Sequence, residues 1–279
     1  MIKANYHTHT IFCDGGDQPE DYLNIALEKK LTAIGFSAHV PLPIANNWSM
    51  RPENFSNYLK ELDHLKSVYS DRIEIYTGLE MDYLPTENPG IIAEYLNKVD
   101  YSIGAVHYLY DAASGNYYEI DGNLGEVDTA FKAIGRGDNR RCVAKYFQEL
   151  TRVVIKYRPN ILGHLDIIKK HNREGRYFDE HDEWYHDLVD ELLVAVSASG
   201  TIIELNTGGM VRDLISQFYP ADWILKKCLA KNIPVVISTD AHQAKDLDGC
   251  FDEAASKLKQ LGFNKQTVLL NNRWQEIDW

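Results

Sequence analysis

Seven short runs of β-branched and apolar residues recur along this chain, and longer stretches with apolar residues at three- and four-residue intervals separate them. This alternation is typical of βα units around a parallel sheet. The predicted strands span residues 2–8, 33–38, 73–79, 101–106, 160–164, 201–206 and 234–239. The predicted helices span residues 19–30, 54–70, 139–157, 179–199, 221–231 and 245–261. Less regular stretches at 41–52, 110–137 and 169–176 are expected to form enlarged loops on the face where the strands end.

The size and composition of the chain fit one large domain. It has 279 residues, of which 44% are hydrophobic and 25% charged, and this supports a sizeable buried core and excludes a disordered or fibrous protein. No repeat, low-complexity tract or flexible linker divides the sequence. We therefore expect residues 1–279 to form a single α/β barrel.

The net charge and the absence of sorting signals narrow the classes of partner. With 29 basic against 41 acidic residues, the formal charge is −12, which argues against nucleic acid as the main ligand. No apolar run approaches the ~18 residues of a membrane span, and the first residues lack the apolar segment of a signal peptide. The four cysteines lie far apart, as expected of reduced thiols. The sequence thus predicts a cytoplasmic protein with neither a membrane nor a nucleic-acid partner.

Metal-competent side chains lie at or just beyond the ends of six of the seven predicted strands. The first strand runs into His7-Thr8-His9, and because side chains alternate along a strand, both imidazoles can face one cation. The seventh runs into Asp240-Ala241-His242, with the same spacing. The ends of parallel barrel strands converge on one face. The candidate ligands are His7, His9, Asp14, His39, Glu80, His107, His164, Asp240 and His242.

Nine nitrogen and oxygen ligands exceed what one ion binds. Catalytic sites of the zinc type use about three protein ligands and a water molecule, so nine ligands indicate two or three ions with a bridging carboxylate and a bridging hydroxide. A set of imidazoles and carboxylates without thiolates suits zinc, manganese or iron. The remaining histidines, at 64, 171, 181 and 186, lack a strand-end position and are expected to face solvent.

The motifs around these residues resemble the polymerase-and-histidinol-phosphatase (PHP) family, and their order resembles its histidinol-phosphate phosphatase branch. They are HTHT at 7–10, SAH at 37–39, GLEMDY at 78–83, GAVHYL at 104–109, GHLD at 163–166, ELNTGG at 204–209 and STDAH at 238–242. The resemblance implies a distorted (βα)7 barrel of the TIM type that holds three metal ions. Ala38 stands where many relatives have an aspartate, and this difference removes none of the candidate ligands.

The resemblance also implies how three divalent ions share the ligands and what they catalyse. His7, His9, Glu80 and Asp240 would hold the first ion, Glu80, His107 and His164 the second, and Asp14, His39 and His242 the third. The implied reaction is hydrolysis of L-histidinol phosphate to L-histidinol and inorganic phosphate in histidine biosynthesis. In it, Asp240 would position the attacking water, and Asp240 and His242 would pass a proton toward the leaving alkoxide.

A phosphate substrate calls for a guanidinium, because its planar fork matches two oxygens at once. Arg212 lies in a stretch after the sixth strand that resembles the family's Asn-Thr-Gly…Arg…Tyr-Pro segment and is the first candidate; Arg158, before the fifth strand, is the second. Arg173 and Arg176 are weaker candidates. The cationic histidinol end would bind acidic or aromatic residues of the fourth loop, of which the candidates are Tyr117, Tyr118, Glu119 and Asp121.

Two other functions stay open on the sequence alone. One is a PHP phosphoesterase with another substrate, such as a nucleotide or a DNA end, and the other is a non-catalytic, metal-stabilised accessory domain. The complete ligand set argues against the accessory domain, and the charge of −12 argues against DNA. An amidohydrolase also uses a His-x-His motif on a barrel, but it needs a carboxylated or bridging lysine, which no predicted strand end offers.

Overall fold

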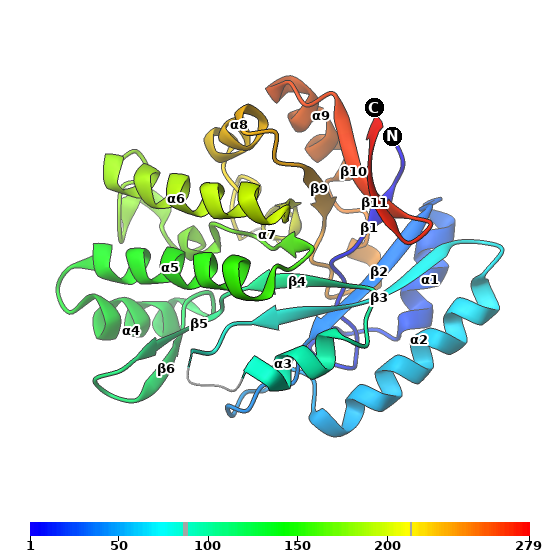
Figure 1. Cartoon of the computed structure of the whole chain (residues 1–279), viewed down its shortest axis with the longest axis horizontal. Coiled ribbons are helices and arrows are strands. Elements are labelled where there is room, and N and C mark those ends of the chain that lie inside the picture. Colours follow the sequence, from blue (N-terminus) through cyan, green and yellow to red (C-terminus); the bar gives the residue numbers. More distant parts are fainter. Residues whose placement is uncertain (86–88, 213) are drawn as a thin grey trace.

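Seven parallel strands form the centre of the computed structural model, which describes residues 1–85, 89–212 and 214–279 (Figure 1). They lie in the order β1 (Ala4–Asn5), β2 (Ala33–His39), β3 (Glu74–Asp82), β4 (Tyr101–Ala105), β7 (Ile161–Leu162), β8 (Ile202–Asn206) and β9 (Val235–Ser238). The two outer strands are joined beyond their ends, where Thr8 forms a parallel bridge with Ala241 and His9 N donates to Ala241 O at 2.9 Å. The sheet is therefore a nearly closed barrel, which confirms the predicted α/β fold.

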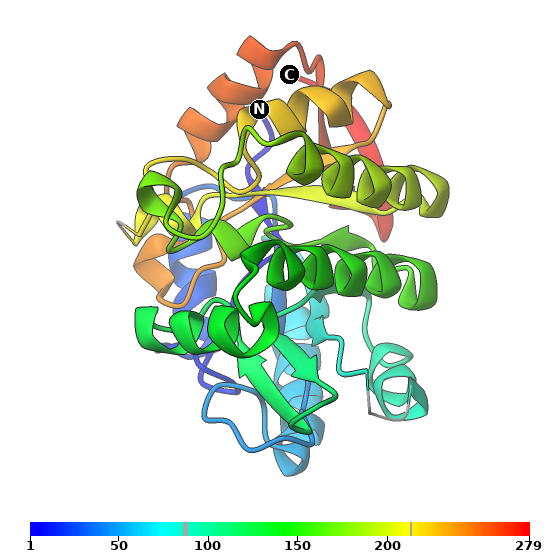
Figure 2. The same ribbon diagram turned by 90° about the vertical axis from the view of Figure 1, so that its left-hand side faces the viewer.

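Helices connect the strands and cover the outside of the barrel. They are α1 (Pro19–Glu28), α2 (Phe55–Tyr69), α3 (Pro89–Leu96), α4 (Leu124–Gly135), α5 (Asn139–Tyr157), α6 (Glu183–Ser199), α7 (Gly208–Val211), α8 (Asp222–Ala230) and α9 (Phe251–Leu261). All six predicted helices are present, and α4, α5 and α6, drawn in green tones, lie side by side in Figure 2. In the part of the chain that the structure describes, no helix combines the length and the apolar character that crossing a membrane requires.

Strands β1, β7 and β9 end before their predicted last residues, and this changes how the site is built. Regular pairing ends at Asn5 in β1 and at Leu162 in β7, so His7, His9 and His164 lie in the segments that follow the strands. In β9 the regular strand pairing ends at Ser238, and Asp240, two residues later, has a φ of 51°. The expectation that Asp240 and its i+2 neighbour share one face of an extended strand is therefore wrong, because the left-handed backbone at Asp240 turns the chain.

The stretch at 110–137 forms regular elements instead of the predicted loop. Strands β5 (Tyr108–Asp111) and β6 (Asn116–Glu119) pair as an antiparallel hairpin, and α4 follows them. Asn123 caps α4 by accepting from the N–H groups of its first turn, while Glu126 Oε2 accepts from Asn123 N at 2.8 Å. This reciprocal cap has a sequence signature, an asparagine followed three residues later by a glutamate, although the helix that it begins was not predicted.

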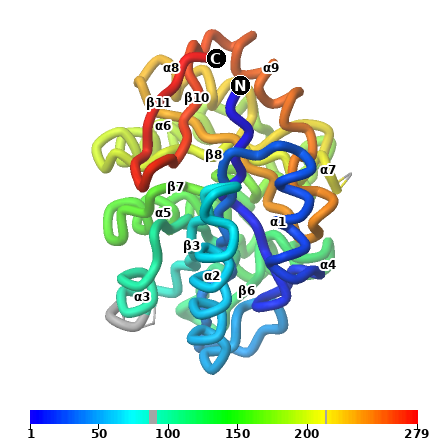
Figure 3. The backbone as a smooth tube through the Cα atoms, turned by 90° about the vertical axis from the view of Figure 1, so that its right-hand side faces the viewer, coloured from blue at the N-terminus to red at the C-terminus, as the bar shows by residue number. Residues whose placement is uncertain are grey.

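The end of the barrel at which the strands begin is closed. Strands β10 (Lys265–Leu270) and β11 (Arg273–Asp278), which were not predicted, form an antiparallel hairpin beside the N-terminus (Figure 3). The Tyr6 hydroxyl donates to Leu269 O and accepts from Leu269 N, both at 2.9 Å, which fastens the hairpin to the barrel. Tyr101 packs edge-on against Tyr6 and donates to its carbonyl at 2.5 Å. A ligand must therefore enter at the opposite end, where the strands finish.

Candidate metal centre

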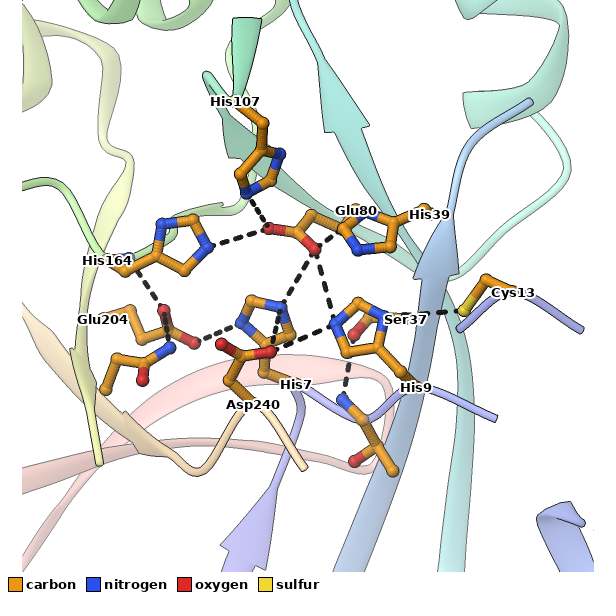
Figure 4. A network of polar contacts seen from close by, with 12 residues as sticks. His7, His9, Cys13, Ser37, His39, Glu80, His107, His164, Glu204 and Asp240 are labelled. Atoms are coloured by element: carbon orange, nitrogen blue, oxygen red, sulfur yellow. Dashed lines mark hydrogen bonds and ion pairs between the residues drawn. The ribbon is translucent and has the colours of Figure 1, made fainter. Parts of the chain in front are cut away.

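One buried carboxylate, that of Glu80 on β3, lies at the centre of the strand-end histidines (Figure 4). Its Oε2 lies 3.2 Å from His7 Nε2 and 3.4 Å from His9 Nε2. Asp240 Oδ1 faces the same two nitrogens at 3.6 Å and 3.2 Å. Two imidazoles and two carboxylates thus surround one small space, in the arrangement that a shared cation needs.

The second oxygen of Glu80 faces two further histidines. Its Oε1 lies 3.0 Å from His164 Nε2 and 3.7 Å from His107 Nε2. The ring centroids of these two imidazoles are 5.2 Å apart. A carboxylate whose two oxygens face separate pairs of imidazoles has the geometry of a bridge between two ions.

A third group of ligands lies where the cluster meets solvent. Asp14, whose side chain is 27% exposed, places Oδ2 at 3.2 Å from His242 Nε2. Its Oδ1 is 3.8 Å from His39 Nε2 and 3.5 Å from His9 Nδ1. His39 also turns Nδ1 toward Glu80 Oε2 at 3.1 Å, which connects this group with the centre. The structure thus brings all nine predicted ligands into one cluster.

The arrangement of the donor atoms in this cluster suits metal binding better than it suits hydrogen bonding between the side chains themselves. Among the described residues, His7 Nε2, His9 Nε2 and His39 Nδ1 are buried without a hydrogen-bond partner, although each faces a carboxylate oxygen. A buried polar atom without a partner is costly, and a cation placed between nitrogen and oxygen removes that cost. Because the donors are imidazole nitrogens and carboxylate oxygens, the residues present suit zinc, manganese or iron.

The ligands of the cluster differ in the protonation state that the protein alone gives them. Burial lowers the pKa of His9 to about 4, and the imidazoles of His242 and His39 add to the effect, so the ring is neutral at pH 7. Burial opposes the ionisation of Glu80, but the imidazoles of His7 and His39 outweigh it and hold the pKa of Glu80 well below its usual range.

Burial opposes the charge of His7 and His107, but Glu204 beside His7 and Asp82 beside His107 outweigh it and hold the pKa of each imidazole well above its usual range. Metals bind neutral imidazole and ionised carboxylate, so metal binding must release the protons of these two rings at neutral pH.

Two further buried carboxylates orient the histidines, and neither was predicted from the sequence. Glu204 Oε1 lies 2.6 Å from His7 Nδ1, and its Oε2 accepts from the backbone N–H of His164 at 2.8 Å. Asp82 Oδ1 lies 2.8 Å from His107 Nδ1 and accepts from its backbone N–H at 2.9 Å. Such contacts determine which ring nitrogen faces the metal. Asp82 has a readable signal, since it follows a predicted ligand by two positions on one strand and so shares its face.

The cluster opens into a cavity of about 420 Å³ that also contains positive charge. Arg212 lines it and donates from Nη1 to Asp240 O at 2.7 Å and from Nη2 to Asp240 Oδ2 at 3.0 Å. Lys170, which was not predicted, lines it as well and donates to the backbone carbonyl of Asp121. Both cations therefore lie where an anionic group of a ligand would enter.

The other predicted arginines do not reach this cavity. Arg158 follows α5 with a left-handed backbone and lines a separate cavity next to the beginning of β7. That position is the closed end of the barrel, so the prediction of Arg158 as a substrate contact is not supported by its place in the fold. Arg173 donates to Leu214 O in an adjoining groove, and Arg176 pairs with Asp128 at 2.9 Å.

Six of the residues that line the cavity are neither candidate metal ligands nor cations: Trp48, Glu119, Asp121, Gly122, Ile167 and Leu214. Glu119 and Asp121 line it, as expected of the fourth loop, whereas Tyr117 and Tyr118 do not belong to its lining residues. Trp48, from the irregular stretch between β2 and α2, lines it too and was not predicted. An aromatic residue in a loop carries no sequence signal that separates a binding role from simple packing.

The histidines outside the cluster take other positions. His64 and His181 are exposed, as predicted. His171 and His186 are half-buried, so the expectation that they face solvent is wrong. His171 Nε2 lies 2.9 Å from Gly122 O, and the His186 ring stacks on Trp223 at a centroid distance of 4.1 Å.

The PHP domain model matches residues 5–208, and the chain therefore belongs to the PHP family. The histidinol-phosphatase of Bacillus subtilis is 28% identical to it over 270 residues, which cover 90% of this chain and 98% of that protein. The histidinol-phosphatase of Lactococcus lactis is 25% identical over 270 residues, which cover 95% of this chain and 93% of that protein.

Two solved structures share the fold. The HisK protein of Listeria monocytogenes has a TM-score of 0.82 at 22% identity, covering 90% of this chain and 99% of that one. The Lactococcus lactis histidinol phosphate phosphatase, solved in complex with zinc, L-histidinol and phosphate, has a TM-score of 0.75 at 22% identity over 98% of each chain. These likenesses confirm the predicted barrel of the PHP type.

The contact between Glu204 and His7 predicts a loss of metal affinity in Glu204→Gln. We expect zinc to bind this variant about 10- to 100-fold more weakly, because the charge that orients the imidazole is gone. A competition titration with a chelator measures the affinity without any substrate, and Glu253→Gln on the exposed face of α9 is the control. Equal zinc affinity of wild type and Glu204→Gln would contradict the orienting role.

The raised pKa of Glu119 predicts that the free energy of unfolding depends on pH. Burial, together with the charges of Asp121 and Glu126, raises the pKa of Glu119 to about 7, against about 4.3 for a glutamate in an unfolded chain. Its contribution to stability is therefore complete below about pH 4 and is lost as the pH rises through about 7. In metal-free protein, Glu119→Gln should gain stability relative to wild type between about pH 5 and pH 8. Urea unfolding measures this difference, and a constant value across the range would contradict the raised pKa.

Proposed function

We propose that this protein is a metal-dependent phosphomonoesterase that hydrolyses L-histidinol phosphate to L-histidinol and inorganic phosphate, a step of histidine biosynthesis. The observation that carries the proposal is the convergence of nine imidazole and carboxylate ligands beside one cavity that also contains Arg212. The relatives in Bacillus subtilis and Lactococcus lactis, which match this chain over more than nine-tenths of their own length, are histidinol-phosphatases. The substrate in this proposal is inferred from the names of these relatives, and the type of reaction is inferred from the groups that line the cavity.

We assign the ligands to three divalent ions of zinc, manganese or iron. The first would be held by His7, His9, Glu80 and Asp240, the second by Glu80, His107 and His164, and the third by Asp14, His39 and His242. His39 and His107 also lie within ligand distance of Asp82, which offers an alternative grouping. Bound there, the ions would supply positive charge for the phosphoryl oxygens and lower the pKa of a water molecule.

Arg212 is placed to bind the phosphoryl group. Its guanidinium contacts Asp240 and lies 3.2 Å from His242 Nδ1, which leaves its other N–H groups for phosphoryl oxygens. Burial opposes its charge, but Asp240 outweighs that effect and raises the pKa of Arg212, so the cation persists at any pH at which the protein is folded. Lys170 adds a second positive charge to the same cavity.

Asp240 is placed to handle the proton of the reaction. Burial opposes its ionisation, but Arg212 and His7 hold the pKa of Asp240 well below its usual range, so it is a carboxylate at pH 7. It can accept a proton from the water molecule that attacks phosphorus and give that proton to the leaving alcohol oxygen as the phosphorus–oxygen bond breaks. His242, whose Nδ1 lies 3.6 Å from Asp240 Oδ1, can relay the same proton.

The cavity favours a small phosphate ester over the end of a nucleic acid. A volume of about 420 Å³ suits a metabolite, and the net charge of −12 repels an extended phosphate backbone.

A substrate panel tests the proposed function. We expect zinc- or manganese-loaded protein to release phosphate from histidinol phosphate with a kcat/KM at least about 10-fold above that for nucleoside monophosphates and sugar phosphates, because only histidinol phosphate pairs a phosphate with a cationic group that Glu119 and Asp121 can bind. Colorimetric phosphate assays at matched concentrations measure this. Histidinol phosphate ranking no higher than the panel would contradict the assignment.

Substitution of the two arginines that the sequence marks as candidates, Arg212 and Arg158, should have different effects on kcat/KM. We expect Arg212→Lys to lower kcat/KM by about 10- to 100-fold, because a lysine cannot replace the planar fork that spans Asp240 and the phosphoryl oxygens. Arg158→Lys should leave kcat/KM unchanged, since that residue lies at the closed end of the barrel. Steady-state kinetics on both variants measure the contrast, and similar losses in the two would contradict the placement of the phosphate.

A further inference from the structure

A buried ion pair begins two residues beyond the ligand His164 and has no part in the proposed mechanism. Asp166 belongs to the GHLD motif that also contains His164, and Lys169 ends the 3₁₀ helix η2 (Ile167–Lys169) that follows. Lys169 Nζ lies 2.6 Å from Asp166 Oδ2, and both side chains are fully buried. Moving two charges out of water costs about as much as their attraction returns, so such a pair adds little net stability. Its contacts indicate another role.

The ion pair contacts the segment that returns to the end of β8. Asp166 Oδ2 accepts from the backbone N–H of Ala221 at 2.9 Å. Lys169 Nζ lies over the ring of Tyr219, 5.6 Å from its centroid. The backbones of Tyr219 and Asn206 exchange two hydrogen bonds, of 2.7 Å and 3.1 Å, and Asn206 is the last residue of β8. The pair therefore supports the residues that pair with the end of this strand.

These contacts complete a ring that includes one candidate metal ligand. Asn206 Nδ2 donates to Glu204 Oε2 at 3.0 Å, and the same oxygen accepts from His164 N at 2.8 Å. His164 O in turn accepts from Ile167 N at 2.8 Å, in the turn that contains Asp166. The segments that follow β7 and β8 are thus joined twice, once through Glu204 and once through Asp166.

The loop that carries Arg212 begins and ends on this ring. It leaves β8 after Asn206, whose Oδ1 accepts from Gly208 N at 2.8 Å, and it returns at Tyr219. Inside this Arg212 loop, Arg212 N donates to Gly208 O at 3.0 Å. The place of the guanidinium therefore depends on both ends of the loop, and the buried ion pair supports the end at Tyr219.

We propose that Asp166 is a positioning residue, which holds the Arg212 loop where the guanidinium meets the phosphoryl group, while Lys169 balances the charge of the buried carboxylate. The proposal rests on the proposed phosphatase function for the identity of the bound anion. Neither Asp166 nor Lys169 lines the cavity that contains Arg212, so their effect on a ligand must pass through the loop. Lys170, the next residue, does line that cavity. The turn at η2 thus directs one lysine to the ion pair and the next to the ligand.

Two double variants that differ only in the acceptor test the proposal. Asp166→Leu/Lys169→Met replaces the pair by apolar side chains, a change that is commonly neutral or stabilising, but it removes the acceptor for Ala221 N. Asp166→Asn/Lys169→Met also removes both charges and keeps an acceptor oxygen. In zinc-loaded protein, inorganic phosphate should bind the first variant about 10-fold or more weakly than wild type, and the second within about 3-fold of wild type. Calorimetric titration measures these affinities, and urea unfolding measures the stability of each variant.

Ala221→Pro removes the donor of the same hydrogen bond and leaves the ion pair in place. The φ of −58° at Ala221 already suits proline, so this variant answers the question if the first double variant does not fold. Its phosphate affinity should also fall about 10-fold. Wild-type affinity in Ala221→Pro, or equal affinity in the two double variants, would overturn the proposal.

Phosphate binding separates this proposal from the phosphatase assignment, because the titration requires no turnover. Affinity that is lost without the acceptor and kept with it supports the positioning role even if histidinol phosphate is not hydrolysed, and the phosphatase assignment alone would then fail. Affinities that follow only the free energies of unfolding, whichever acceptor is present, overturn the positioning role even if histidinol phosphate is hydrolysed. A zinc-loaded wild type that binds no phosphate overturns it as well.

Discussion

The buried carboxylate of Glu80 is the constraint on which the rest of the structure depends. Its side chain is 1% exposed, and an ionised group at that depth persists only if opposite charge or metal surrounds it. Five imidazoles from β2 and from the segments after β1, β4 and β7 point at its two oxygens, which makes it the natural bridge of a metal cluster. The barrel fold brings these distant parts of the sequence together at one point.

The same contacts that build the site also hold the barrel together. Glu204 links the segments after β1 and β7 by binding His7 and the backbone of His164, and it lies on β8. The bridge between Thr8 and Ala241 closes the gap between the first and last strands immediately beside the ligands. Removing a ligand or its orienting carboxylate should therefore affect both metal affinity and the closure of the barrel, and these effects need separate measurements.

The ligand set could be predicted from the sequence because it follows from chemistry and periodicity: polar, metal-competent residues recur where apolar runs end. The backbone conformation at those positions could not be predicted, since His164 and Asp240 have positive φ values although neither is a glycine, the residue that most often marks such a conformation in a sequence. Glu204 was missed because a carboxylate inside an apolar strand gives no hint of which imidazole it will meet. Arg158 was misplaced because closeness to a strand in sequence does not say which end of the barrel a residue reaches, and Trp48 was missed because loop geometry is not encoded locally.

Anomalous diffraction from crystals of the zinc-loaded protein tests the central claim most directly, namely that these side chains hold a cluster of metal ions around Glu80. Data on the two sides of the zinc absorption edge should show ions about 2.0–2.2 Å from the imidazole nitrogens of His7 and His9 and from the carboxylate oxygens of Glu80 and Asp240, with Glu80 shared by a second ion near His164. A map without any ion among these side chains, or with ions bound only elsewhere on the protein, would contradict the account.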